Sequence, residues 1–285
     1  MTRHWRKRVT QGLITASLYF AMLLFIFPVF WMVFTSFKVD REVNAFPMVW
    51  IPTELTLRNY YKIFGSHVQA GSAAFASYFL HSVTVAFCAT LLSLVLGTFA
   101  AYAFARSRFR GKNGYFIFLL LMRAVPGVAL SLPLLILTNA IKLSNSVVGL
   151  IVIYTALISP FVAWLMEGFF AEIPPDLSQQ ALVDGASKWQ AMVLVDVPLA
   201  APGMAASALF AFLLAWNEFP VASMIAPGLA SRTLPVGLLD YVSEFFTDWG
   251  GITAAGTLTL IPAVIFALLV QRNIIRGLTF GALKE

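Results

Sequence analysis

FLHSVTVAFCATLLSLVLGTFAAYAFA, residues Phe79–Ala105, is a predominantly apolar stretch that contains no Asp, Glu, Lys or Arg. An α-helix rises about 1.5 Å per residue, so about 20 apolar residues cross a hydrocarbon core about 30 Å thick. The stretch is long enough to do this. We therefore expect it to be a transmembrane helix that has the bilayer, and not water, as its solvent.

Five further apolar blocks of similar length lie on either side of this one. They are Leu13–Thr35, Tyr115–Leu137, Val147–Phe170, Gly203–Ile225 and Gly251–Gln271. Of the 285 residues, 60% are hydrophobic and 11% are charged, whereas soluble domains carry about 25% charged residues. Because the sequence shows no repeat or low-complexity tract, it predicts one all-α membrane domain over residues 1–285 with six transmembrane helices.

The first block follows a basic N-terminus, as the apolar core of a signal peptide does. It is longer than the roughly 7–15 residues of such a core, and no small-x-small cleavage site ends it. We therefore expect a retained first span.

The positions of Lys and Arg predict the orientation of the spans, because short cytoplasmic loops carry an excess of these residues. One side of the predicted domain receives 12 of the 19, and the other side receives six. The richer side comprises the tails 1–12 and 272–285 and the loop 171–202, together with the second-to-third connection. We expect that side to be cytoplasmic, with both termini on it, and the segment 36–78 to be ordered structure on the outer side of a bacterial inner membrane.

The sequence offers little for catalysis, metal binding or nucleic-acid binding. Cys88 is the only cysteine, and His4, His67 and His81 do not have the spacing of metal ligands. No nucleophile–base pattern is visible. The net charge of +6 comes from basic residues that flank apolar blocks, so membrane topology explains it better than a nucleic-acid partner does.

Prolines interrupt several of the predicted spans. Pro126 and Pro133 lie in the third, Pro160 in the fourth and Pro262 in the sixth. A proline inside a span leaves a backbone carbonyl without its helical donor, so broken helices often line a cavity. An ordinary kink within a packed bundle is the alternative for each of them.

The loop between the fourth and fifth spans, AEIPPDLSQQALVDGASKWQAMVLVDVPLAAPG, predicts two short helices. Asp176 with Gln179 has the spacing of a capping box, and so has Ser187 with Gln190. Gly185 suits the left-handed position that follows a helix. We expect the first helix to end near Gly185 and the second to end before Pro198.

This loop resembles the "EAA" loop of binding-protein-dependent ABC importer permeases, in which Glu-Ala-Ala is followed after three residues by Gly and after nine more by I-x-L-P. The corresponding residues here are Gln179, Gln180, Ala181, Asp184 and Gly185 within QQALVDGAS, then Val195, Val197 and Pro198. Both long spacings agree. The departure is that Gln179 stands in place of the family's glutamate and Gln180 in place of its first alanine.

Other segments resemble the sugar-importing branch of the same family, in particular the six-span second permease of maltose transporters. They are MRAVPG at Met122–Gly127, AWNEF at Ala215–Phe219 and the C-terminal QRNIIRGLTFGALKE. The resemblance implies a type I ABC importer permease fold in which the loop is a coupling element for an ATPase subunit. It also implies these partners: a second permease, two ATP-binding subunits that bind ATP and Mg, an extracytoplasmic solute-binding protein and a sugar-like solute.

The chain itself has no G-x-x-x-x-G-K-[ST] phosphate-binding loop, so we expect no cofactor on it and no enzymatic activity. Arg123, Asn217 and Glu218 fall within predicted spans, where ionisable groups are costly and face a cavity or a polar partner. Trp216 could offer a face to a sugar ring, although aromatic residues in spans usually serve packing. These four residues are the candidates for lining the translocation path.

Two other classes of protein share some of these features. A secondary transporter driven by an ion gradient would also have broken helices and charges within spans. An inverted repeat would favour this alternative, and we find none; the cytoplasmic loop would also have no use in it. A membrane-embedded enzyme would need convergent acid, base or metal ligands, and the spans contain too few.

Overall fold

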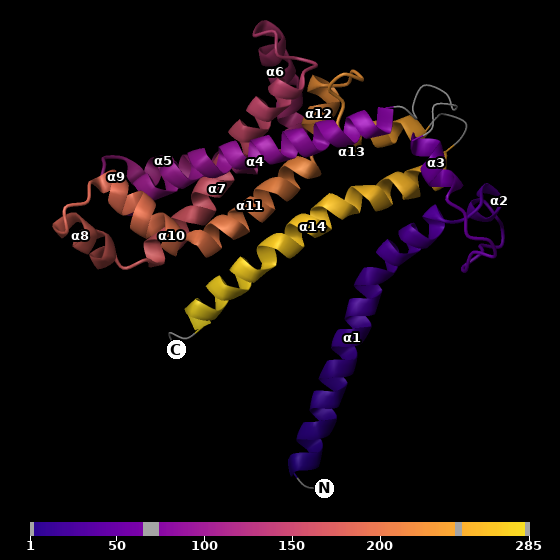
Figure 1. Cartoon of the computed structure of the whole chain (residues 1–285), viewed down its shortest axis with the longest axis horizontal. Coiled ribbons are helices and arrows are strands. Elements are labelled where there is room, and N and C mark those ends of the chain that lie inside the picture. Colours follow the sequence, from indigo (N-terminus) through magenta and orange to yellow (C-terminus); the bar gives the residue numbers. More distant parts are fainter. Residues whose placement is uncertain (1–2, 65–73, 243–246, 283–285) are drawn as a thin grey trace. The chain divides into compact units, whose positions relative to one another are not determined.

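The computed structural model describes residues 3–64, 74–242 and 247–282, and these form a helical protein (Figure 1). Helices α1–α7 are Arg3–Ser36, Asp40–Val43, Arg58–Phe64, Ala74–Arg106, Lys112–Ala124, Gly127–Ala140 and Val147–Glu172. Then come α8 (Pro175–Val183), α9 (Lys188–Ala191), the π-helical turn η1 (Met192–Asp196), α10 (Val197–Leu199) and α11 (Ala201–Trp216). The last elements are α12 (Pro220–Ile225), α13 (Leu234–Gly237), the 3-10 turn η2 (Leu238–Tyr241) and α14 (Trp249–Ala282).

Four single helices in the described part of the chain are long and apolar enough to cross a membrane, and two bent pairs raise the number to six. The single helices contain Thr10–Ser36, Phe75–Arg106, Val147–Glu172 and Trp249–Gln271. The all-α membrane fold class is therefore confirmed. Helix α1 is already helical at Arg3, so it begins within the predicted N-terminal tail 1–12, whereas its candidate span begins at Thr10.

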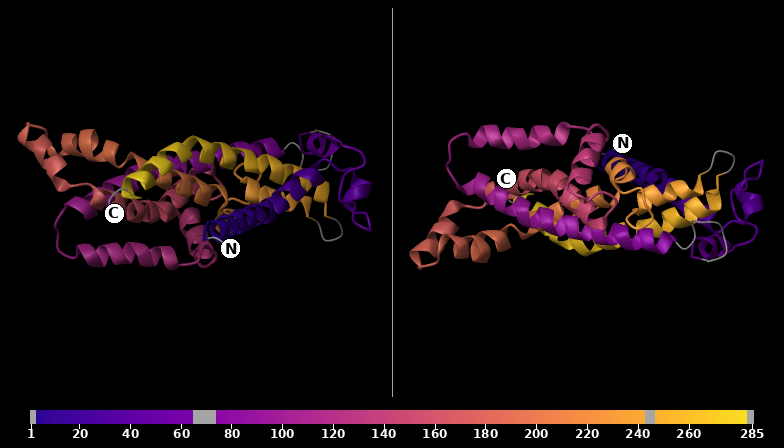
Figure 2. Two further views of the ribbon diagram at one scale, coloured as in Figure 1. Left: turned by 90° about the horizontal axis from the view of Figure 1, so that it is seen from below. Right: turned by 90° about the horizontal axis from the view of Figure 1, so that it is seen from above.

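The third predicted span, Tyr115–Leu137, is not one rod but two helices, α5 and α6, set at 97° to each other. The bend is clear in both views of Figure 2. Val125 has an extended backbone (φ −73°, ψ 123°), the conformation that the ring of Pro126 favours by making the helical one unfavourable for the residue before it. Pro133, Pro160 and Pro262, in contrast, lie inside continuous helices.

The fifth predicted span, Gly203–Ile225, is also interrupted. Helix α11 ends at Trp216 and α12 begins at Pro220, a residue with no backbone N–H to continue the helical ladder. Preceding α11 is the segment Lys188–Leu199, which meets it at 74°. The predicted block Gly203–Ile225 therefore contains a break that the sequence analysis did not predict, and it lies directly before Pro220.

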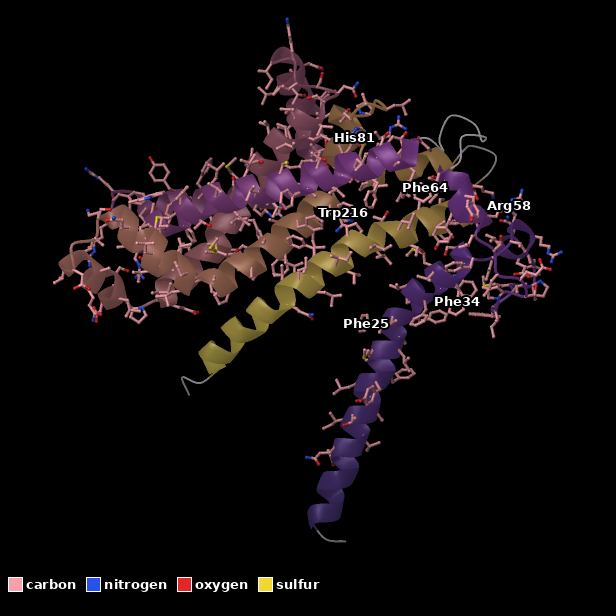
Figure 3. The ribbon with its side chains drawn as sticks, in the orientation of Figure 1. Phe25, Phe34, Arg58, Phe64, His81 and Trp216 are labelled. Carbon is pink, nitrogen blue, oxygen red and sulfur yellow. The ribbon has the colours of Figure 1, made fainter. Side chains whose placement is uncertain are left out.

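The described residues divide into two units, and the first comprises those within Met1–Ala73 and Asp240–Thr259. Its longest helix is α1, from which apolar side chains such as Phe25 and Phe34 project (Figure 3). Phe25 is 79% exposed. The outer segment was predicted to be ordered structure, and this holds for residues 36–64. Residues 65–73 lie outside the described part.

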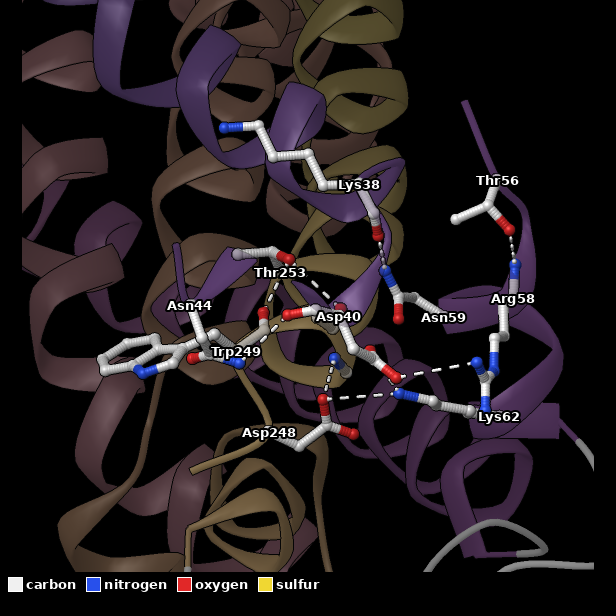
Figure 4. A network of polar contacts seen from close by, with 12 residues as sticks. Lys38, Asp40, Asn44, Thr56, Arg58, Asn59, Lys62, Asp248, Trp249 and Thr253 are labelled. Carbon is white, nitrogen blue, oxygen red and sulfur yellow. Dashed lines mark hydrogen bonds and ion pairs between the residues drawn. The ribbon is translucent and has the colours of Figure 1, made fainter. Parts of the chain in front are cut away.

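A polar network organises the outer segment of the first unit (Figure 4). Lys62 Nζ lies 2.7 Å from Asp40 Oδ1 and 3.9 Å from Asp248 Oδ1, so it joins α3 to α2 and to the start of α14. Asn59 donates hydrogen bonds to the carbonyl oxygens of Ser36 and Lys38. The segment is thereby fixed to the end of α1 and does not form a free loop.

The second unit comprises Ala74–Leu239 and Leu260–Glu285, and its core is the contact between α4 and α7. Leu150, Val162 and Met166 of α7 are fully buried. A side chain at Gly97 of α4 would come within 2.6 Å of Val162 Cγ1, so the two helices approach as closely as only glycine permits. Helix α11 packs on both, and α12 lies beside α6 (Figure 1).

Candidate functional site

The loop that carries the family pattern folds into α8, α9, η1 and α10, which lie at one end of the second unit (Figure 1). Its first helix starts two residues earlier than the sequence predicts. Pro174 is the N-cap and Pro175 the first helical residue, a position that suits proline because its missing N–H is not needed there. Asp176 is therefore inside the first turn, and the predicted capping box between Asp176 and Gln179 does not form.

The end of α8 confirms the prediction for Gly185, which has φ +92°. The N–H of Gly185 donates to the carbonyl of Leu182 (3.2 Å), and the N–H of Ala186 donates to that of Ala181 (3.0 Å). These two bonds are the Schellman arrangement that closes a helix. Nothing lies within 4 Å of where a Cβ on Gly185 would be, so the requirement for glycine here is conformational and not spatial.

The second short helix begins as predicted and ends differently. The Ser187 hydroxyl accepts the N–H of Gln190, and the Gln190 side chain accepts the N–H of Ser187, which completes a capping box. Helical conformation then continues through η1 and past Pro198 to Leu199. The predicted end before Pro198 is wrong because proline is tolerated in the first turn of the segment that follows the wider π-helical turn.

A buried carboxylate, Asp196, holds this loop to the membrane helices, and the sequence analysis did not find it. Its side chain is fully buried. Oδ1 lies 2.9 Å from Nη2 of Arg106, the last residue of α4, and both carboxylate oxygens are 2.8 Å from the Ser178 hydroxyl of α8. Arg106 also donates to the carbonyl of Ile173, directly before α8. The end of α4, the start of the loop and η1 therefore meet at one ion pair.

The opposite side of α8 is exposed to solvent. A shallow open depression there is lined by Asp176, Gln179, Gln180, Val183 and Asp184. Val183 is 87% exposed. Ala181 is half-buried beneath this face, and Gly185 and Pro198 are exposed. The face thus combines two carboxylates, two amides and an apolar residue on a helix whose other side is anchored.

Trp216 and Asn217, two candidates for the translocation path, lie where α11 ends. Trp216, labelled in Figure 3, is 2% exposed. Its ring stacks on Phe212 at 5.5 Å and meets Phe79 edge-on at 6.1 Å, contacts that support the packing interpretation for this residue. Asn217 is exposed and donates to the carbonyl of Leu213, which caps the end of the helix.

Glu218 lies in the interruption between α11 and α12. Its Oε1 accepts the N–H of Val221 (2.8 Å), and its Oε2 accepts the N–H of Ala222 (2.9 Å). The hydroxyl of Tyr154 on α7 donates to Oε2 at 2.7 Å. The carboxylate therefore satisfies the unpaired donors at the start of α12, where the helix dipole also favours a negative charge.

Arg123 is in the last turn of α5, directly before the sharp bend. Its side chain is exposed, and its guanidinium carbon lies 5.4 Å from the centroid of the Phe161 ring. Arg123 and Glu218 thus have separate partners within the chain. The role of either residue in lining a path stays a prediction.

Comparison with known proteins agrees with this architecture. The family described as binding-protein-dependent transport system inner membrane component matches residues 93–280. The diacetylchitobiose uptake system permease protein DasC of Streptomyces coelicolor is 34% identical over 269 residues, which are 93% of this chain and 95% of the relative. The trehalose transport system permease protein SugB of Mycobacterium tuberculosis is 36% identical over 259 residues, 90% of this chain and 92% of the relative.

Solved structures extend the likeness to the fold. A chain of a bacterial ABC transporter involved in the import of the acidic polysaccharide alginate superposes with a TM-score of 0.78 at 19% identity. The superposition covers 95% of this chain and 98% of that one. A chain of the MetNI methionine ABC transporter in inward-facing conformations gives a TM-score of 0.59, covering 73% of this chain and 98% of that one, at 16% identity.

Proposed function

The chain belongs to the binding-protein-dependent transport system inner membrane component family and is a permease subunit of an ATP-driven importer, and we propose that its solute is a sugar or an oligosaccharide. The observation that carries this proposal is the likeness to permeases named for diacetylchitobiose and trehalose over at least 90% of this chain. The ion-gradient alternative finds no support among these relatives.

Permeases of this kind work with ATPase and solute-binding partners and are not enzymes themselves. For this chain we propose a second permease, two ATP-binding subunits that hold ATP and Mg, and one extracytoplasmic solute-binding protein. The absence of a phosphate-binding loop in the sequence supports a separate ATPase. The distribution of Lys and Arg supports cytoplasmic N- and C-termini in a bacterial inner membrane.

We further propose that the exposed face of α8, with Gln179, Gln180 and Asp184, contacts an ATPase subunit. The anchoring of the opposite side of the loop supports this role. A movement imposed on α8 acts directly on Ser178 and Asp196, and through Asp196 on Arg106 at the end of α4. Because the pair is buried, the loop moves with α4 instead of absorbing the displacement, and a change at the ATPase becomes a change between two states of the membrane helices.

The test is reconstitution of the importer in liposomes with its ATPase, its second permease and its solute-binding protein. We expect ATP-dependent uptake of a labelled sugar ligand of the binding protein. Replacing Val183 by Lys should weaken ATPase association because it places a charge in the exposed face. The matched control is Val148→Lys, which changes a valine that is also exposed, 58% against 87%, but lies in the first turn of α7.

Two outcomes would contradict the proposal. One is solute uptake by the purified chain alone under an ion gradient, which would establish the secondary-transporter alternative. The other is wild-type ATPase association in Val183→Lys together with loss of it in Val148→Lys, which would place the contact elsewhere.

A further inference from the structure

The part of the outer segment between α2 and α3 exposes a concentration of large apolar side chains. We call residues 46–57 the outer apolar loop. Its exposed apolar members are Phe46 (100%), Met48 (56%), Trp50 (64%), Ile51 (78%), Leu55 (74%) and Leu57 (52%). In water such a group would be an unfavourable surface, and large exposed apolar patches mark contact with a protein or a membrane.

The loop is held back against the last turns of α1. The Trp50 ring meets the Trp31 ring edge-on, with centroids 5.2 Å apart. Lys38 Nζ donates to the carbonyl of Val49 at 2.6 Å and lies 3.9 Å from the centroid of the Trp31 ring. These contacts hold the loop beside Trp31, a residue inside α1.

That level can be placed relative to the bilayer from the length of the span. The apolar part of α1 is Thr10–Ser36, whose midpoint is Leu23. Trp31 lies eight residues beyond Leu23, about 12 Å along the helix at about 1.5 Å per residue. Half of a hydrocarbon core is about 15 Å thick. Trp31, and Trp50 beside it, are therefore near the boundary between acyl chains and headgroups.

The residue types at the contact between the outer apolar loop and α1 are also those found at the acyl–headgroup boundary. Trp is enriched there because its ring is apolar and its N–H is polar, and Lys places an apolar stem in the boundary with its ammonium toward polar groups. The opposite character appears in the exposed ion pair of Arg41 with Glu54, whose side chains are 69% and 65% exposed. The segment thus exposes both charged and large apolar side chains.

We propose that the outer apolar loop is a lipid-binding anchor, with Trp50 and Ile51 inserted into the acyl–headgroup boundary of the leaflet at the C-terminal end of α1. The occupant of the patch is the phospholipid bilayer. The anchor sets the depth of α1 in the membrane and fixes the outer polar network to the lipid surface. This proposal does not depend on which solute the importer carries, so it is independent of the proposed sugar specificity.

The test uses the assembled importer in nanodiscs of phosphatidylcholine and phosphatidylglycerol, with Cys88→Ala as background. Spin labels are attached to Ile51→Cys, to Phe46→Cys and, as a control on the charged surface, to Glu54→Cys. Ile51 is the principal site because its replacement leaves the Trp31–Trp50 contact intact. Accessibility to oxygen and to a water-soluble nickel chelate is measured, and depth is calibrated with spin-labelled lipids in the same nanodiscs.

We expect a higher ratio of oxygen to nickel accessibility at Ile51 and Phe46 than at Glu54, with a depth at the acyl–headgroup boundary. Nickel accessibility at Ile51 equal to that at Glu54 would show a loop in water and overturn the proposal. Protection of Ile51 from both reagents would show a protein partner on the patch and overturn it equally. Neither result depends on whether the importer carries a sugar.

Discussion

Two carboxylates in the second unit, Asp196 and Glu218, are stabilised in different ways. Asp196 in the loop after α7 is fully buried and is paired with a cation, Arg106, at 2.9 Å. Glu218, in the interruption of the fifth span, is half-buried and accepts hydrogen bonds from two backbone N–H groups and from Tyr154. The first joins two distant segments, whereas the second mainly completes the helix that it precedes.

This difference indicates which of the two carboxylates is expected to pass a movement of the loop on to the membrane helices. A carboxylate that satisfies the N–H groups three and four residues ahead stabilises its own backbone and adds one contact to a neighbouring helix. A carboxylate paired with a cation ninety residues away makes two elements move together. We therefore expect changes at Asp196 to affect coupling to ATP hydrolysis, and changes at Glu218 to affect the shape of the interrupted span.

The largest effect is expected for Asp196→Ala. It leaves the guanidinium of Arg106, 15% exposed, without its counter-ion, and breaking a buried pair costs about 3–5 kcal/mol. Thermal unfolding in detergent should show a large drop in the midpoint, and ATP hydrolysis by the assembled importer should become uncoupled from uptake.

The control for Asp196→Ala is the double variant Asp196→Leu with Arg106→Met, which removes both charges and retains apolar volume. Its stability should lie close to wild type. A double variant that is as unstable as Asp196→Ala would show that shape, and not the unpaired charge, is responsible.

A smaller effect is expected for Glu218→Ala, which removes the hydrogen bonds from two backbone N–H groups and from Tyr154 but leaves no unpaired buried charge behind. The start of α12 should fray, and this should appear as faster hydrogen exchange at the amides of Val221 and Ala222. Glu218→Gln keeps one carbonyl acceptor and should lose less. If transport changed in both variants while hydrogen exchange did not, Glu218 would act on the translocation path and not on the backbone.

Gly185→Val tests the backbone conformation at the end of α8 and leaves the Asp196–Arg106 ion pair unchanged. A non-glycine residue in the left-handed region costs about 1–2 kcal/mol, and the Schellman bonds should weaken. We expect ATPase association to fall while pairing with the second permease persists. Gly168→Ala is the matched control, because nothing lies within 4 Å of its added Cβ and its φ is not positive. Equal loss in both variants would contradict the conformational argument.

The smallest effect is expected for Tyr154→Phe. It removes the hydroxyl that donates to Glu218 and leaves the two backbone bonds in place, so only one of the three hydrogen bonds that Glu218→Ala removes is lost. A drop in the thermal midpoint as large as that of Glu218→Ala would mean that the contact between α7 and Glu218, and not the capping of α12, dominates this site.

The sequence predicted those features that depend on local chemistry. Apolar block length located the spans, and the preference of glycine for positive φ located the end of α8 at Gly185. The residues of the second capping box, Ser187 and Gln190, were found by spacing alone. The family pattern identified the loop, and the relatives confirm the family.

The misses arose where a competing local rule or a distant contact decided the outcome. Proline at the first helical position moved the start of α8 and removed the expected role of Gln179 as a cap. Asp196 was missed because its partner Arg106 is far away in the sequence, and a single acidic residue in a polar loop gives no signal. Glu218 drew attention because it lies in an apolar block, although its partners are mainly its own backbone.

The close approach of α4 and α7 at Gly97 and Val162 has a consequence for how sequences of this kind diverge. A methyl group at position 97 would lie 2.6 Å from Val162 Cγ1, 2.7 Å from Val162 Cβ and 3.0 Å from the backbone nitrogen of Ala163, so a shorter side chain at position 162 would not make room for it and the two helices would have to separate. Position 97 is therefore expected to keep its glycine as such sequences diverge, whereas the side chain at position 162 can become smaller without forcing a change at position 97.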